Sequence, residues 1–120
     1  MSQNTHNTSV RYIHLDDQLP KEIHRLYDEM VEQALIVVFQ RDQSTAKQEV
    51  TELRARFAGA SQGTLNMLLH ENPVNLAADI VGATNEALMS EPLISRIKSF
   101  NATERPVFEA KADVVVASLA

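Results

Sequence analysis

The stretch PKEIHRLYDEMVEQALIVVFQR, residues 20–41, decides the fold that this chain can adopt. Apolar residues recur along it at spacings of three and four, which places their side chains on one stripe of an α-helix. The stripe consists of Ile23, Leu26, Tyr27, Met30, Ala34, Val37 and Val38. Polar residues such as Arg25 and Asp28 occupy the opposite face. The pattern therefore predicts an amphipathic helix over residues 20–41, roughly 33 Å long.

The polar face of this helix turns apolar after Glu32, where Leu35, Ile36 and Phe39 take the places of the charged residues. A helix that is apolar nearly all round is buried on every side. Two explanations stay open: the helix is the central one of its own subunit, or a second subunit covers it. The second explanation predicts a self-association or partner surface built from Leu35, Ile36, Val38 and Phe39.

The polar face of the first half of this helix is acidic. We expect Asp28, Glu29 and Glu32 to face solvent or a basic partner. The whole chain has a formal net charge of −5, which argues against general binding to nucleic-acid phosphates because that requires a basic face. Binding at a membrane surface needs a basic amphipathic helix, and this acidic helix does not provide one.

The composition places the chain among ordinary globular proteins. Its 120 residues predict one domain. The chain has no cysteine, which excludes disulfides, thiolate metal sites and a cysteine nucleophile. The first nine residues lack the pattern of a secretory signal, and the longest apolar run, residues 34–39, is far shorter than the ~20 residues of a membrane span. We therefore expect a soluble, cytoplasmic protein.

Most of the remaining chain is predicted to be helical. Thr45 with Gln48 fits a capping box, and Asn72 followed by Pro73 fits a helix start. The expected helices cover residues 20–41, 45–58, 64–72, 73–89, 93–100 and 106–120, with a linker at 101–105. The three valines at 114–116 also suit a strand, but alanine-rich flanks favour a helix there.

The predicted fold class is all-α, a compact bundle of five to six helices that forms a single domain over residues 10–120. Residues 1–9 are polar and are expected to form a disordered tail. Residues 10–15, VRYIHL, favour extended backbone. We expect them to form a short strand or an arm that packs on the helices.

No motif in the chain indicates catalysis. His24 and Asp28 are four residues apart and reach the same side of a helix, but a catalytic zinc site normally takes three protein ligands. A nucleophile elbow, a phosphate-binding loop and a dinucleotide-binding fingerprint are all missing from the sequence. We therefore expect no catalytic, cofactor-binding or metal-binding residues, and a protein that is not an enzyme.

The segment 73–89 resembles a helix-turn-helix in its spacing of small residues, with Gly82 at the position of the turn. Its would-be recognition part, residues 84–91, contains Glu86 and Glu91 but no Lys or Arg for phosphates or base edges. We therefore expect one continuous helix here, and we keep a DNA-binding regulator using residues 73–89 as the alternative function. The favoured function is a non-catalytic protein–protein interaction module (regulatory, adaptor or chaperone-like) that self-associates as a homodimer.

Overall fold

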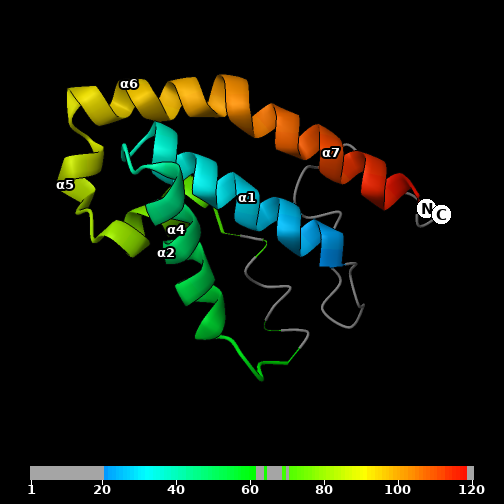
Figure 1. Cartoon of the computed structure of the whole chain (residues 1–120). Helices are drawn as coiled ribbons and strands as arrows, with labels where there is room; N and C mark the ends of the chain where they lie inside the picture. Colours follow the sequence, from blue (N-terminus) through cyan, green and yellow to red (C-terminus); the bar gives the residue numbers. More distant parts are fainter. Residues whose placement is uncertain (1–20, 62–63, 65–68, 70, 119–120) are drawn as a thin grey trace.

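Helix α1 (Lys21–Val37) is the central element of the fold. The computed structural model describes residues 21–61, 64, 69 and 71–118 (Figure 1). Helix α1 contacts α2 (Gln43–Ala55), α4 (Pro73–Val81), the π-helix η3 (Phe100–Glu104) and α7 (Arg105–Ala117). No strand occurs among the described residues. The prediction of an all-α, compact bundle is confirmed.

Helix α1 ends at Val37 and not at Arg41, so the predicted C-terminal boundary was wrong. The reason is the backbone of Gln40, which has a φ of 57° and lies in the left-handed region. The amide of Arg41 then donates to the carbonyl of Leu35 at 3.0 Å, which satisfies one of the last carbonyl groups of the helix. A left-handed residue after a helix is usually glycine, so no residue type at this position indicated the end of the helix.

Helix α2 begins earlier than the capping box predicted. Its N-cap is Asp42, whose carboxylate accepts a hydrogen bond from the Thr45 amide at 2.7 Å. Thr45 therefore lies inside the helix, and the predicted pairing of Thr45 with Gln48 was wrong. The hydrogen bond from the Thr45 amide lowers the pKa of Asp42, since it favours the charged carboxylate.

Helix α4 starts as predicted but ends sooner. The Asn72 side chain accepts from the Val74 amide at 2.8 Å, and Pro73 occupies the first turn. The expectation of one helix from 73 to 89 was wrong, because Gly82 adopts a left-handed φ of 73° and ends α4 at Val81. Thr84 then caps the short helix α5 (Asn85–Leu88) by accepting from the Ala87 amide at 3.0 Å.

Residues 91–117 form one long helical rod. Helix α6 (Glu91–Ser99), η3 and α7 follow one another without a break (Figure 1). The linker predicted at 101–105 was therefore wrong. Pro106 lacks an amide hydrogen and its ring clashes with the carbonyl four residues before it. The wider turn of η3 lies directly before Pro106 and lets the helix continue past it.

The valines at 114–116 belong to α7, so the helix favoured there is confirmed and the strand alternative is excluded. Of the short helix predicted at 64–72, only Thr64, Leu69, Glu71 and Asn72 are described, and Leu69 is buried. The predicted tail at 1–9 and the arm at 10–15 lie outside the described residues.

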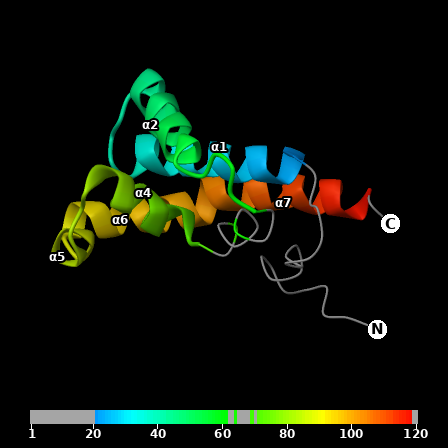
Figure 2. The ribbon, with the colours of Figure 1, turned by 90° about the horizontal axis from the view of Figure 1, so that it is seen from below.

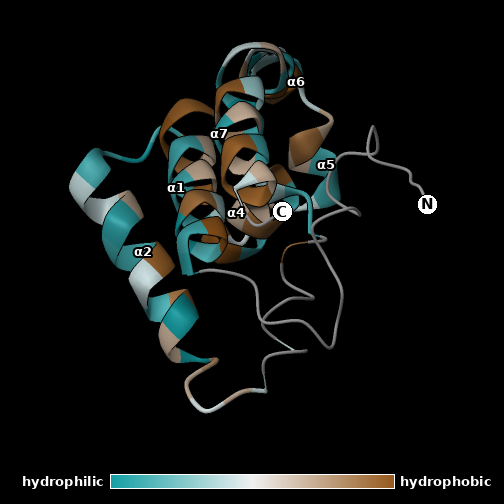
Figure 3. Cartoon of the chain, turned by 90° about the vertical axis from the view of Figure 1, so that its right-hand side faces the viewer, coloured by the Kyte–Doolittle hydropathy of each residue, from teal (hydrophilic) through white to brown (hydrophobic). Residues whose placement is uncertain are grey.

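The core lies between α1, α4 and the rod. Helices α1 and α7 run side by side in opposite directions (Figure 2). Apolar segments of α1, α4 and α7 gather in the middle of the bundle, while α2 stands at its edge (Figure 3). The largest fully buried side chains are Phe100, Leu35, Val31, Val38 and Pro73. Three of these five come from α1 and the residue after its end, so α1 supplies the centre of the core.

The left-handed conformation of Gln40 makes a stability prediction. A non-glycine residue in this region is strained by about 1 kcal/mol, and the Gln40 side chain is exposed. Gln40→Gly is therefore expected to raise the free energy of unfolding by up to about 1 kcal/mol. The measurement is urea denaturation, with a higher midpoint and an unchanged slope.

The matched control is Gln48→Gly, the same substitution at an exposed residue inside α2. There glycine is expected to lower the free energy of unfolding by about 1 kcal/mol, because it weakens a helix interior. Equal destabilisation by both variants would contradict the assigned role of Gln40.

Candidate functional site

The four residues predicted to form an interaction surface divide into two pairs. Leu35 and Val38 have no exposed surface, and both belong to the core of this chain. Ile36 and Phe39 are partly buried and pack against that core. Of the predicted surface, only Ile36 and Phe39 therefore keep area that a partner can reach. The part that they play in association stays a prediction.

The end of α1 is held by the rod through a polar contact. Arg96 of α6 donates from Nε to the carbonyl of Val38 at 2.7 Å. This carbonyl follows the last turn of α1, where carbonyl groups lack partners within the helix and the dipole favours a positive charge. Arg96 lies 58 residues from Val38, so no local pattern in the sequence indicated this contact.

The three acidic residues predicted to face a partner all line one groove between α1 and α2, with a volume of about 580 Å³. Asp28 is already engaged, because Arg54 Nε lies 2.8 and 2.9 Å from its two carboxylate oxygens. Glu29 accepts from Arg25 at 3.0 Å. The structure therefore brings Asp28, Glu29 and Glu32 together but pairs the first two with arginines of this chain.

Glu32 differs from its two acidic neighbours in its environment. Burial in the groove raises its pKa above the ordinary value, and the carboxylates of Glu29 and Asp28 add to this rise. The positive charge of Lys47 opposes it. Glu32 is thus a carboxylate whose charge is partly desolvated, on the wall that faces α2.

His24 and Asp28 were considered as a pair of metal ligands, and the described part of the chain places no third ligand beside them. Asp28 is held by Arg54. Within residues 21–61, 64, 69 and 71–118, no group of three or more His, Cys, Asp or Glu side chains is placed to hold a metal ion. In the same part of the chain, no helix is long and apolar enough to cross a membrane.

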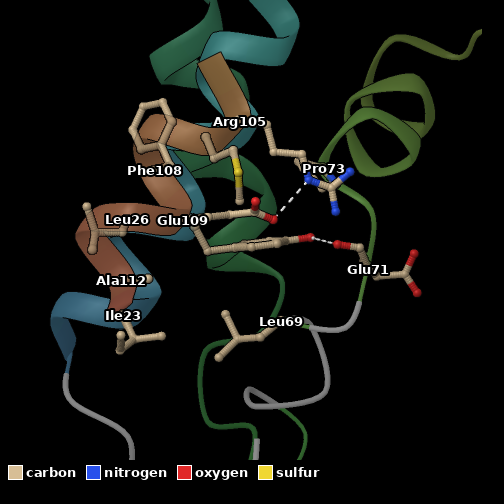
Figure 4. Close-up of a pocket in the computed structure, with 11 residues that line it drawn as sticks. Ile23, Leu26, Leu69, Glu71, Pro73, Arg105, Phe108, Glu109 and Ala112 are labelled. Atoms are coloured by element: carbon tan, nitrogen blue, oxygen red, sulfur yellow. Dashed lines mark hydrogen bonds and ion pairs between the residues drawn. The ribbon is translucent and has the colours of Figure 1, made fainter. Parts of the chain in front are cut away.

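A second hollow lies between the first half of α1 and the start of α7 (Figure 4). We call it the α1–α7 pocket; it is lined by Ile23, Leu26, Tyr27, Met30, Leu69, Glu71, Pro73, Arg105, Phe108, Glu109 and Ala112. The Tyr27 hydroxyl donates to the Glu71 carbonyl at 2.8 Å, and Arg105 pairs with Glu109 at 3.3 Å. Burial raises the pKa of Tyr27, so its hydroxyl keeps its proton.

Sequence reasoning missed the α1–α7 pocket, because its walls come from three separate parts of the chain. The one available signal was the apolar stripe of the first helix, which places Ile23 and Leu26 on a shared face. On the facing helix α7, Phe108 and Ala112 are both partly buried.

Helix α7 is unusual in that none of its 13 residues is buried. Val107 and Val114 are exposed by 52% and 70%, and their spacing of seven places them on the same side of the helix. Two exposed valines on one face do not stabilise the helix itself, because valine is a weaker helix former than alanine. We call this pair the α7 outer face.

Comparisons of the chain with family models, with curated proteins and with solved structures found no match.

The raised pKa of Glu32 predicts a pH-dependent effect of Glu32→Gln. A carboxyl whose folded pKa lies above its unfolded value is penalised when ionised, so its cost appears as pH rises through and above 4.5. Glu32→Gln removes that cost. Thermal unfolding should show a small rise in midpoint at pH 7 that disappears at pH 3.5.

The control is Glu86→Gln, which removes the same charge from an exposed residue of α5. A gain from Glu32→Gln that persists unchanged at pH 3.5 would mean that its stabilisation does not come from ionisation.

Proposed function

We propose that this protein is a non-catalytic protein–protein interaction module of the cytoplasm that works as a homodimer. The observation that carries the proposal is the α7 outer face. Val107 and Val114 are exposed while α7 packs on α1 with its other side. A cysteine-free chain also suits a reducing compartment.

The energetics favour a partner on this face. Burying one valine side chain contributes about 1.5 kcal/mol, and a symmetric dimer buries the same residues twice. Four valines, two from each copy, supply an apolar centre that the polar rim of the helix surrounds. Ile36 and Phe39, each partly buried, are a second surface at which a partner is able to add burial.

The acidic groove between α1 and α2 supports a basic partner at one residue, Glu32. Asp28 and Glu29 are compensated by Arg54 and Arg25, which leaves Glu32 with Lys47 as its nearest opposing charge. A basic partner gains most at Glu32, whose desolvated carboxylate a positive charge would stabilise.

The test of the homodimer is the mass in solution. Sedimentation of the full chain at micromolar concentration should give twice 13.4 kDa. Val114→Glu should shift the mass to that of one chain, because it places a charge at the centre of the α7 outer face. Its thermal midpoint, measured at a concentration where both proteins are monomeric, should change little since Val114 is exposed.

The control is Thr51→Glu, which adds the same charge at an exposed, β-branched residue of α2 and should leave the dimer intact. A wild-type mass of 13.4 kDa at these concentrations would contradict the homodimer. Dissociation by Phe39→Glu but not by Val114→Glu would move the surface to the end of α1.

The alternative is a DNA-binding regulator that uses residues 73–89. The break at Gly82 favours it, because α4 and α5 are then two helices joined by a turn. Helix α5 has four residues, however, and carries Glu86 without any Lys or Arg. A gel-shift assay separates the two functions: binding to generic DNA at low salt that added salt abolishes would support the regulator.

A further inference from the structure

We propose that residues 10–15 of this chain, VRYIHL, dock in the α1–α7 pocket. This inference concerns a contact within one chain and is independent of the proposed homodimer. Three features support it: the apolar lining of the pocket, its small volume, and the short stretch of chain between the pocket and this segment.

The walls of the pocket are mostly apolar. Ile23 and Leu26 of α1 lie on the same side as Phe108 and Ala112 of α7, and Leu69 and Pro73 lie across from them (Figure 4). Phe108 and Ala112 are only partly buried, so this side of α7 keeps apolar area uncovered. The occupant of the pocket must therefore be apolar.

The size of the pocket selects between kinds of occupant. Its volume is about 70 Å³, whereas pockets for small-molecule ligands measure roughly 300–1,000 Å³. A space of this size accepts one or two side chains of a peptide segment. Residues 10–15 offer Val10, Tyr12, Ile13 and Leu15, the apolar cluster that precedes α1 in the sequence.

The segment is within reach of the pocket. Five residues separate Leu15 from Lys21, the first residue of α1, and the chain from Leu15 to Lys21 spans up to ~20 Å when extended. The α1 wall of the pocket, from Ile23 to Met30, is about 10 Å long. A tether this short gives an effective concentration in the millimolar range, so the chain's own segment outcompetes that of a second copy at micromolar protein.

The polar groups that line the pocket are matched among themselves. Arg105 pairs with Glu109 at 3.3 Å, and the Glu71 carbonyl accepts from the Tyr27 hydroxyl at 2.8 Å (Figure 4). An apolar segment suits this lining, because it brings no further charge to the pocket.

The experiment uses the full chain and its lack of cysteine. Ser9→Cys introduces a single thiol beside the segment, and a nitroxide spin label attached there broadens the NMR signals of nearby amides. We expect strong broadening at Phe108 and Ala112 and none at Ala87 of α5. Adding Ile13→Asp should restore the signals of Phe108 and Ala112 to at least half of their unlabelled intensity.

A stability readout accompanies the spin label. Ile13→Asp is expected to lower the thermal midpoint by about 4 °C or more, because it removes the apolar contact between the docked segment and the α1–α7 pocket. Thr5→Asp adds the same charge to the same terminal stretch, outside residues 10–15, and should leave the midpoint unchanged. Ala112→Leu, which fills the pocket from the α7 side, should make the effect of Ile13→Asp smaller.

Three results would overturn the proposal. The first is the absence of broadening at Phe108 and Ala112. The second is broadening that survives Ile13→Asp, since proximity alone would then explain it. The third is broadening that appears only when labelled chains are mixed with unlabelled, isotope-enriched ones, because the docked segment would then come from another copy.

Discussion

The burial of the second half of α1 under other helices of its own chain is the constraint on which the rest of the fold depends. Leu35 and Val38 have no exposed surface, and Phe100 of the rod is equally buried in the same core. Each such side chain contributes about 1.5–3 kcal/mol relative to exposure. Covering this half on all sides requires α2, α4 and the rod to pack round α1, which fixes the arrangement of the bundle.

Polar contacts between distant parts of the chain then fix how the helices sit on α1. Arg96 donates to the carbonyl of Val38, and the Tyr27 hydroxyl donates to the carbonyl of Glu71. Arg54 donates from Nε to both carboxylate oxygens of Asp28. The three contacts join α1, or the residue just after it, to α6, to α2 and to the residues that precede α4. Sliding α1 along any of these three neighbours therefore costs a hydrogen bond. The buried apolar surface supplies most of the stability, and these contacts specify a single arrangement.

The helical class follows from the pattern of apolar residues, since periodicity over 20 residues is a strong signal. The same pattern allowed the first helix to be either the central one of its own subunit or covered by a second subunit. The end of α1, the break at Gly82 and the continuous rod did not follow. Gln40 is left-handed although it is not glycine, Gly82 ends a helix that its neighbours favour, and η3 carries the chain past Pro106. Of the predicted interaction surface, Leu35 and Val38 belong to the core, and the role of Ile36 and Phe39 stays a prediction. The α1–α7 pocket depends on tertiary contacts that no local pattern in the sequence indicates.

Two surfaces of α7 connect this fold to the functions proposed for it, the outer face with Val107 and Val114 and the inner side at the pocket. Both depend on α1 as a rigid support, so the most direct test measures α1 itself by amide hydrogen exchange. The amides of Leu35 and Val38 should exchange slowest in the chain, only through global unfolding, and far more slowly than that of Val114. Exchange at Leu35 and Val38 as fast as at Val114 would contradict the central position of α1.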